Sequence, residues 1–342
     1  MTLTVGIIGC GEITSKARAE QLDAAEGIEI GIAMDVAEWA AEDIGDRFNV
    51  PHTTDEAEVI NHPDVDFVYI ATPHHLHAEQ TIRAARAGKH VVVEKPIATS
   101  AADAREMIAV AEEEGVKLSV PLGRFSASAQ LAKEWVESGL IGEVVGTRIV
   151  YLGRKPDSYW SSGFTGRIET DWRQRAEGAG GGVLIMNNIH DIDRMRHITG
   201  LDEVRVYAEG DTFVTDVEVE DFICVTVRYE NGAIGNIESS SFIVAGFDGG
   251  PYNRIYGEHG TIELANPVRL RTSEETHIGD ANEWHEVEPE PFSFNFFEEF
   301  ARAVEQDTEV PVPAEDARKD VEVVLGAYRS AERNEPVSLP LD

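Results

Sequence analysis

The first 121 residues alternate short apolar runs with segments of helical periodicity, and this alternation constrains the fold more than any other feature. Apolar runs rich in β-branched residues predict strands at 4–9, 28–34, 66–71, 90–93 and 116–120. The spacing between them predicts helices at 15–25, 36–48, 54–60, 77–87 and 100–114. Strands that are apolar on both faces and alternate with helices form a parallel sheet with right-handed crossovers. The predicted fold class is therefore α/β, with an N-terminal Rossmann doubly wound parallel sheet.

The pattern changes after Pro121. Runs that alternate apolar with polar residues predict strands at 144–151, 204–208, 222–229, 233–239, 254–257 and 260–264. Helices are predicted at 126–138, 297–305 and 314–332. We therefore expect two domains: an NAD(P)-binding domain at 1–121, and an α+β domain at 122–342 with a large, mainly antiparallel open sheet. The last helices are candidates for packing back on the first domain.

A pair of glycines follows the first predicted strand. Gly9 and Gly11 give most of the G-x-G-x-x-G fingerprint of dinucleotide binding, and Thr14 stands in the place of the third glycine. Gly9 permits the tight turn, and Gly11 lets backbone amides approach a pyrophosphate at the N-terminus of the next helix. Glu12 and Ile13 complete the turn. The motif is weak alone, but here it lies at the right place in a β–α–β unit.

Asp35 ends the second predicted strand, about 24 residues past Gly11. That is close to the spacing of roughly 20 expected for the carboxylate that binds the adenosine ribose hydroxyls. An acid there repels a 2′-phosphate and so favours NAD over NADP, while the basic side chains of Arg18 and Arg47 leave NADP open. The structural alternative is that Asp35 only caps the helix beginning near Val36.

Polar residues also end the strand at 66–71. Thr72, Pro73 and His77 are expected to line the cofactor cleft there. His74, His75 and His77 fall within four residues, but they do not share a helix face and no carboxylate or cysteine cluster accompanies them. No metal site is therefore predicted.

Glu94, Lys95 and Pro96 follow the three valines of the strand at 90–93. Pro96 has no N–H and ends the ladder of hydrogen bonds. Ligands of open α/β sheets bind outside the carboxyl ends of the strands, so Lys95 lies where such a protein carries its chemistry. The structural alternative is a lysine at the sheet edge beside a solvated glutamate.

A glycine-rich stretch at 178–182 leads into a predicted helix with a second group of polar residues. Asn187, His190 and Asp193 share a face of this helix with Met186, through spacings of three and four residues. A histidine among apolar neighbours is more often a satisfied core residue. The flexible glycines and the amide and carboxylate neighbours favour a functional histidine.

The chain carries 63 acidic and 29 basic residues among 342, a formal net charge of −34. Such an excess of acid repels nucleic acid, whose binding needs basic patches. The acids are dispersed and lysine is scarce, which is typical of a halophile's protein adapted to molar salt, where charges are screened over a few ångström.

No window of about 18 uninterrupted apolar residues occurs, so no membrane span is expected, and the N-terminus lacks the pattern of a signal peptide. Cys10 and Cys224 are isolated and have neither disulfide nor metal spacing. The expected location is a reducing cytoplasm.

The sequence resembles the glucose-fructose oxidoreductase, inositol dehydrogenase and MocA (Gfo/Idh/MocA) family over nearly its whole length. The motifs that carry the resemblance are Gly9-x-Gly11, Thr72-Pro73 with His77, Glu94-Lys95-Pro96, Ser138-Gly139-x-Ile141-Gly142, Trp172-Arg173, the glycine run, and His190-x-x-Asp193. The resemblance implies a dehydrogenase that uses NAD, with NADP possible, on a CH–OH group of a sugar, sugar acid or cyclitol. It also implies a homodimer or homotetramer formed through the C-terminal sheet.

Catalytic roles follow from the same resemblance. Lys95 contacts the reacting hydroxyl and the nicotinamide ribose, and its ammonium suits stabilisation of a developing alkoxide. His190 is the general acid/base, a task that the ordinary imidazole pKa of about 6.5 suits. Many family members have an aspartate four residues before this histidine. Met186 occupies that position here, so a polyol specificity that depends on the aspartate is not carried over.

Two sets of residues are expected to form the site. Cofactor contacts are expected from Gly9, Gly11, Glu12, Ile13, Asp35, Thr72, Pro73, His77, Glu94 and Lys95. Substrate contacts are expected from Arg124, Trp172, Arg173, Asn187 and Asp193, with Tyr159 a further wall residue; each has an alternative as a surface or core residue. Two other functions remain open: a same-family enzyme that recycles tightly held NAD within one turnover, as a glycosidase or epimerase does, and a non-catalytic regulator that senses NAD and sugar.

Overall fold

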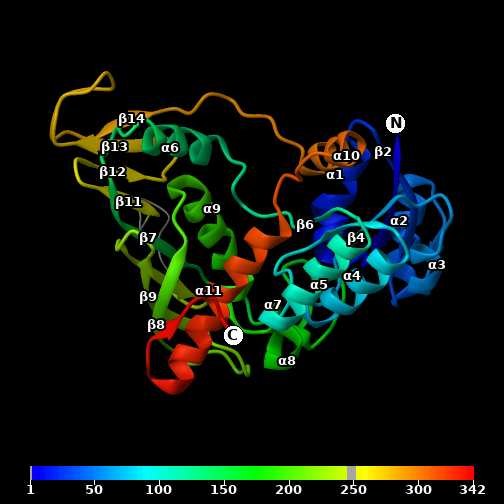
Figure 1. The fold of residues 1–342 in the computed structure, drawn as a ribbon. Helices are drawn as coiled ribbons and strands as arrows, with labels where there is room; N and C mark the ends of the chain where they lie inside the picture. Colours follow the sequence, from blue (N-terminus) through cyan, green and yellow to red (C-terminus); the bar gives the residue numbers. More distant parts are fainter. Residues whose placement is uncertain (1, 245–251) are drawn as a thin grey trace. The chain divides into compact units, whose positions relative to one another are not determined.

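The computed structural model describes residues 2–244 and 252–342 (Figure 1). The chain divides into two compact units, each assembled from three stretches. Unit 1 comprises Met1–Pro121, Pro156–Gly180 and Phe294–Val321, and unit 2 comprises Leu122–Lys155, Gly181–Ser293 and Glu322–Asp342. The boundary expected at residue 121 is thus one of several places where the chain passes from one unit to the other.

Unit 1 contains a six-stranded sheet in which every neighbouring pair is parallel. The strands are β1 (Leu3–Ile8), β2 (Ile28–Met34), β3 (His52–Thr53), β4 (Phe67–Ile70), β5 (His90–Val93) and β6 (Leu118–Ser119). Their order, β3-β2-β1-β4-β5-β6, is that of the Rossmann fold. The prediction of a doubly wound sheet is confirmed. The two-residue strand β3 was not predicted, because it has no apolar run of its own.

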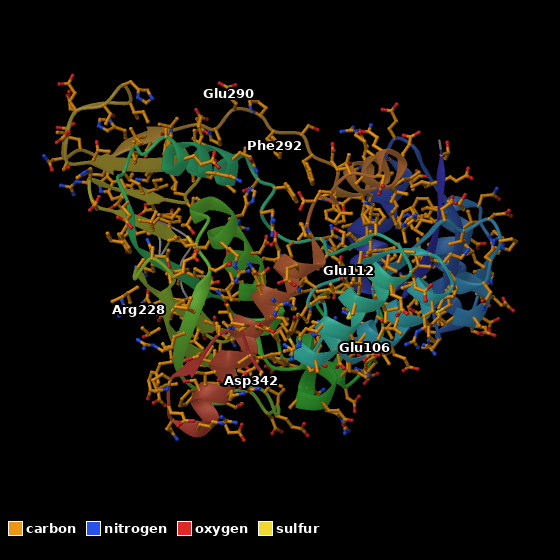
Figure 2. The ribbon with its side chains drawn as sticks, viewed as in Figure 1. Glu106, Glu112, Arg228, Glu290, Phe292 and Asp342 are labelled. Carbon is orange, nitrogen blue, oxygen red and sulfur yellow. The ribbon has the colours of Figure 1, made fainter. Side chains whose placement is uncertain are left out.

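Helices connect these strands. They are α1 (Ala19–Asp23), which follows a π-helical turn η1 (Thr14–Arg18), then α2 (Glu38–Phe48), α3 (Glu56–Ile60), the 3₁₀ turn η2 (His74–Leu76), α4 (His77–Arg86) and α5 (Ala101–Glu113). Ser100 caps α5 by accepting a hydrogen bond from the backbone N–H of Asp103, at 3.0 Å. Figure 2 shows Glu106 and Glu112 on α5, and both of these acidic side chains are exposed to solvent.

Two later stretches of chain complete unit 1. They carry α7 (Tyr159–Ser162), the 3₁₀ turn η3 (Trp172–Gln174), α8 (Ala176–Ala179) and α10 (Phe296–Gln306). Phe297 meets Tyr69 edge-on with ring centroids 5.5 Å apart, and Phe300 lies 5.4 Å from Phe67. These four aromatic side chains are fully buried, so α10 closes the core of the unit against β4.

Unit 2 contains a nine-stranded sheet. Its strands are β7 (Val144–Leu152), β8 (Glu203–Asp211), β9 (Phe222–Tyr229), β10 (Ile234–Ser240), β11 (Arg254–Gly257), β12 (Gly260–Glu263), β13 (Val268–Thr272), β14 (His285–Val287) and β15 (Val337–Ser338). The order is β14-β13-β12-β11-β7-β10-β9-β8-β15, and every pair is antiparallel except β7 with β10. The predicted α+β fold with a mainly antiparallel sheet is confirmed.

One face of this sheet is covered and the other is open. Along β9, Ile223, Val225 and Val227 are buried, whereas Cys224 and Thr226 between them are exposed. The covering helices are α6 (Ala127–Glu137), α9 (Ile189–Thr199), which follows a π-helical turn η4 (Leu184–Asn188), and the later turns of α11 (Ala314–Arg333). Within the described ranges, no helix combines the length and apolar character needed to cross a membrane.

Candidate active site

The glycine turn lies at the carboxyl end of β1. Gly9 has φ +101°, and a Cβ on it would lie 2.7 Å from the backbone of Ala71, so no other residue fits. A Cβ on Gly11 would meet nothing within 4 Å, which leaves open space in front of the turn. The hydroxyl of Thr14 donates to the carbonyl of Gly9 at 2.6 Å, so the residue that replaces the third glycine ties the turn closed.

Asp35 lies beside this turn and is 8% exposed. Its Oδ2 accepts a hydrogen bond from the backbone N–H of Cys10 at 2.8 Å, and its Oδ1 accepts one from that of Ala37 at 2.9 Å. The alternative role of Asp35 as the N-cap of the following helix is wrong, because α2 begins at Glu38 and its N-cap, Ala37, has no side-chain capping bond. Each carboxylate oxygen still has lone-pair capacity for a further donor, such as a ribose hydroxyl. The turn and the carboxylate together fit a dinucleotide.

The two basic residues considered for NADP are both engaged elsewhere. Arg18 donates from Nε to Glu94 Oε1 at 2.7 Å. Arg47 donates to the carbonyl of Ser15 at 2.8 Å and pairs with Glu20. Neither contact points to a 2′-phosphate role.

Glu94 and Lys95 follow β5 and form one charged cluster with Arg18. Burial raises the pKa of Glu94, but Arg18 and Lys95 outweigh burial and hold that pKa below its usual range. The hydroxyl of Tyr69 donates to the same carboxylate at 3.1 Å. Burial lowers the pKa of Lys95 despite the opposing charge of Glu94, and Arg18 and Arg173 lower it further. Lys95 is thus a partly buried amine that gives up its proton more readily than an exposed lysine.

His77 connects two strand ends. Its Nδ1 lies 2.8 Å from the carbonyl of Pro96, and its Nε2 lies 2.9 Å from the carbonyl of Thr72. Burial lowers the pKa of this fully buried ring. His77 therefore fixes the loop after β4 against the loop that carries Lys95, while Pro73 begins the next turn.

His74 and His75 contact a different segment. Nδ1 of His74 lies 2.8 Å from the carbonyl of Ala179, and Nδ1 of His75 lies 3.2 Å from that of Gly178. Burial holds the pKa of His74 well below its usual value, so its ring is neutral at pH 7. Among residues 2–244 and 252–342, no group of three His, Cys, Asp or Glu side chains is arranged to hold a metal ion.

Trp172 and Arg173 lie in unit 1 near Lys95. The ring of Trp172 packs at a tilt of 59° against that of His74, with ring centroids 4.5 Å apart. The guanidinium of Arg173 lies 4.4 Å from the ring centre of Trp172 and 5.5 Å from that of Tyr159, and its charge acts on Lys95. The structure therefore brings these predicted wall residues to the strand end that carries the lysine.

The same stretch, 156–180, also covers the glycine turn. The backbone N–H of Phe164 donates to Glu12 Oε2 at 2.9 Å, and a Cβ on Gly163 would overlap that carboxylate. Arg167 donates from Nε to the carbonyl of Cys10 at 2.9 Å. The adjacent Ile13 is 40% exposed. No local pattern predicts these contacts, since the partners are about 150 residues apart.

In unit 2, one carboxylate holds the start of the helix that carries His190. Glu220 accepts hydrogen bonds from the backbone N–H groups of Gly182 at 2.5 Å and Leu184 at 2.9 Å. Tyr328 donates to it at 2.9 Å and accepts from the N–H of Ile185 at 3.2 Å. Burial raises the pKa of Glu220 to about 7, against the effect of these donors. Neither Glu220 nor Tyr328 was identified from the sequence.

The polar residues of this helix differ in exposure. Asn187 and His190 are partly exposed, while Met186 is 3% exposed and Asp193 fully buried. The buried Oδ1 of Asn187 has no hydrogen-bond partner among the described residues, which suits a polar ligand. A Cβ on Gly123 would lie 3.0 Å from Cβ of His190, so a glycine there lets the chain run against the helix.

Arg124 and Asp193 bind each other. Nε of Arg124 donates to Asp193 Oδ1 at 2.9 Å, Nη2 forms a second contact with the same oxygen, and the two residues are 7% and 0% exposed. A buried pair of this kind fixes the segment after Pro121 to α9. Both residues were expected to contact substrate; what the geometry supports directly is that they position α9.

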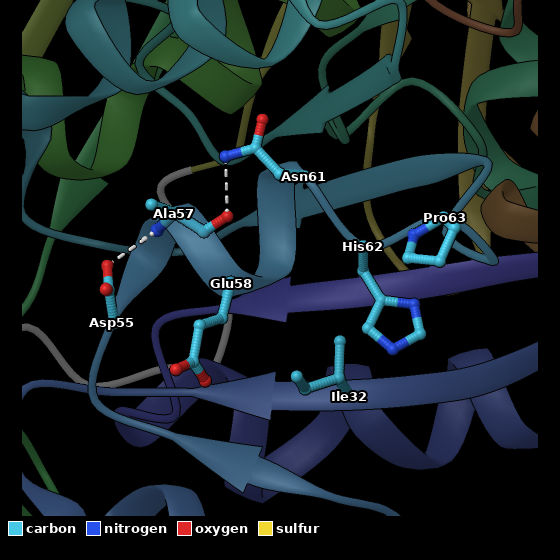
Figure 3. A pocket seen from close by; sticks show the side chains of 7 residues that line it. All are labelled: Ile32, Asp55, Ala57, Glu58, Asn61, His62 and Pro63. Atoms are coloured by element: carbon cyan, nitrogen blue, oxygen red, sulfur yellow. Dashed lines mark hydrogen bonds between the residues drawn. The ribbon is translucent and has the colours of Figure 1, made fainter.

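One surface pocket has a different lining from the residues described above. It is lined by Ile32, Asp55, Ala57, Glu58, Asn61, His62 and Pro63 (Figure 3). Asp55 accepts a hydrogen bond from the N–H of Ala57 at 2.9 Å and so caps α3. No predicted site residue lines this pocket.

Comparison with known families supports the cofactor assignment. Residues 3–122 match the model of an oxidoreductase family with an NAD-binding Rossmann fold, and residues 129–263 match the GFO/IDH/MocA C-terminal domain. The resemblance identified from the motifs is thereby confirmed, as is NAD as the type of cofactor.

Three known proteins illustrate the similarity. The 1,5-anhydro-D-fructose reductase of Ensifer adhaerens is 30% identical, over 75% of this chain and 74% of its own. The myo-inositol 2-dehydrogenase of Thermotoga maritima is 30% identical, over 79% of this chain and 77% of its own. The crystal structure of an aldose-aldose oxidoreductase from Caulobacter crescentus, complexed with glycerol, is 27% identical with a TM-score of 0.84, and covers 99% of this chain and 100% of that one.

Proposed function

Because this chain belongs to the GFO/IDH/MocA family of NAD-binding oxidoreductases, we propose that it transfers hydride between the nicotinamide and a hydroxyl-bearing carbon of a sugar, sugar acid or cyclitol. One observation carries the proposal most: Lys95 stands partly buried at the carboxyl end of β5, with its amine in a cluster of fixed charges. The names of the two relatives, a reductase of an anhydro-sugar and a dehydrogenase of an inositol, support the substrate class.

The nicotinamide, when bound, supplies the hydride acceptor for oxidation or the donor for reduction. We assign its binding to the predicted set Gly9, Gly11, Glu12, Ile13, Asp35, Thr72, Pro73, His77, Glu94 and Lys95. The open space at Gly11 and the remaining acceptor capacity of Asp35 support this assignment. His77 acts indirectly, since its ring nitrogens face two backbone carbonyls.

Lys95 and His190 are the proposed catalytic residues. Oxidation of an alcohol needs a group that takes the hydroxyl proton and a positive charge that stabilises the developing alkoxide. We assign proton transfer to His190, at the partly exposed face of its helix, and alkoxide stabilisation to Lys95. The lowered pKa of Lys95 eases its exchange of a proton with an alkoxide oxygen.

Substrate recognition is assigned to Trp172, Arg173 and Asn187. An indole face and a guanidinium suit the apolar and polar faces of a sugar ring. The unsatisfied amide oxygen of Asn187 accepts from a hydroxyl. Arg124 and Asp193 are proposed to act through their mutual ion pair, which positions the helix of His190, and not through direct contact.

Domain roles and surroundings are also proposals. We assign cofactor binding to residues 1–121 and substrate binding to the remainder of the chain, with the open face of the nine-stranded sheet joining subunits of a homodimer or homotetramer. The dispersed acid residues support a halophilic source, and the two free cysteines support a cytoplasmic location.

A second function is favoured by a specific feature. The contacts of Phe164 and Arg167 with the cofactor turn would slow coenzyme release, as a protein that recycles its NAD internally requires. The name of the aldose-aldose oxidoreductase also describes a transfer between two sugars. A sensor without catalysis is disfavoured by the intact cluster at Lys95.

The proposal is tested with Lys95→Met and, as a matched control, Lys16→Met, which removes an exposed lysine near the same turn. We expect Lys95→Met to lower kcat for sugar or cyclitol oxidation by at least about 100-fold while NADH still binds, and Lys16→Met to change kcat little. Full turnover by Lys95→Met would contradict the assigned role.

A further inference from the structure

Arg167 comes from a distant part of the chain and is linked through Cys10 to Asp35, the carboxylate that we assign to the cofactor ribose. Arg167 reaches the cofactor turn from the stretch 156–180, and its side chain is 15% exposed. Its Nε donates to the carbonyl of Cys10 at 2.9 Å, and the N–H of the same Cys10 donates to Asp35 at 2.8 Å. The backbone of Cys10 therefore connects the guanidinium of Arg167 with the carboxylate of Asp35, whose negative charge disfavours a 2′-phosphate.

The rest of the guanidinium is held against the start of α2. Its Nη2 donates to Asp43 at 2.6 Å, and its carbon lies 5.2 Å from the ring centre of Trp39. Trp39 and Asp43 are four residues apart and share a face of α2, which begins three residues after Asp35. Nη1 has no hydrogen-bond partner within the described ranges and remains available to a ligand.

The surface here is open and apolar. Val36, next to Asp35, is 84% exposed, and Trp39 is 50% exposed although it packs on Arg167. In the Rossmann fold this end of the second strand receives the adenosine ribose, and an arginine nearby accommodates the 2′-phosphate of NADP. Arg18 and Arg47 are committed to Glu94 and Glu20, so Arg167 is the arginine placed for that contact.

Resting on the proposed use of a nicotinamide cofactor, we propose that Arg167 is the residue that admits NADP to this site, in opposition to Asp35. Asp43 is its counter-charge and reduces the attraction for the phosphate. Two carboxylates against one guanidinium leave the ribose end with net negative charge, so the native protein prefers NAD and tolerates NADP.

The test measures dissociation constants of NADH and NADPH by fluorescence titration of cofactor-free protein, a readout independent of turnover. Arg167→Gln should weaken NADPH binding about tenfold or more, which is the loss of a charge-assisted hydrogen bond, and weaken NADH binding much less. Asp43→Asn should strengthen NADPH binding by up to about fivefold, since it removes a partly exposed ion pair. Arg47→Gln makes the same charge change as Arg167→Gln but lies on α2, one turn beyond Asp43, and should alter neither constant.

Equal weakening of NADH and NADPH by Arg167→Gln would show that the arginine only supports the turn, and would overturn the proposal. If native NADPH binding is too weak to measure, the same comparison is made in an Asp35→Ser background. There, Asp35→Ser should bind NADPH and the double variant with Arg167→Gln should not; equal binding by both would again overturn the proposal. Failure of the native protein to bind either nucleotide would instead contradict the proposed function.

Discussion

Glu220 is predicted to make the stability of unit 2 depend on pH. Its carboxylate accepts hydrogen bonds from Gly182, Leu184 and Tyr328 at the start of the helix that carries His190. Burial raises its pKa from 4.5 to about 7, so the folded protein holds this proton more tightly than the unfolded chain does. Stability from this group is therefore present below pH 4.5 and is lost as the pH rises to about 7.

The magnitude follows from the two pKa values. A rise from 4.5 to about 7 corresponds to about 3 kcal/mol of unfolding free energy lost between these pH values. This is an upper bound, because Glu220 keeps some contact with solvent. For a domain of 150–250 residues, about 2–4 °C of Tm corresponds to each kcal/mol, so the effect on Tm is at most roughly 6–12 °C.

The assay compares the native protein with Glu220→Gln by calorimetry between pH 4.5 and 8 at constant high salt. Glutamine cannot ionise, so we expect the stability of the native protein relative to Glu220→Gln to fall by up to about 3 kcal/mol between pH 4.5 and pH 8. Glu332→Gln, an exposed change on the helix that carries Tyr328, serves as control and should follow the native curve. Parallel curves for the native protein and Glu220→Gln would refute the reasoning.

Three further outcomes are expected. Met186→Asp places a carboxylate one turn from His190, so the acid limb of the kcat/KM profile should move about one pH unit higher, at a cost in Tm because the site is buried. Arg18→Met leaves the buried Glu94 without its main partner, and urea unfolding should show a loss of about 3–5 kcal/mol, largely recovered by adding Glu94→Gln. Thr14→Val removes the hydroxyl that ties Gly9, so NADH titration should show weaker binding with unchanged kcat; unchanged binding would contradict that role.

The sequence predicts those parts of the fold that depend on the pattern of neighbouring residues. The strands of unit 1 are continuous apolar runs, and Gly9 must be glycine because of its φ of +101° and the backbone of Ala71. The loss of the third fingerprint glycine had no explanation in the sequence alone. The structure supplies one, because the hydroxyl of Thr14 closes the turn.

The parts that could not be predicted depend on contacts between distant residues. Arg167 meets Cys10 across 157 positions, and Glu220 meets Gly182 across 38, without any local motif at either end. The ion pair between Arg124 and Asp193 could not be predicted from the sequence either, so each residue was expected to contact substrate by itself. Residue type and spacing identified the charged groups, and only the tertiary structure shows which of them neutralise one another.

The most direct test of the central claim is NADH absorbance at 340 nm in molar KCl, with NAD or NADP against aldoses, sugar acids and cyclitols, alongside a measurement of nucleotide bound to the purified protein. We expect steady production of reduced cofactor with one substrate group, greater with NAD than with NADP. No reduced cofactor with any compound, from protein that binds nucleotide, would contradict the dehydrogenase.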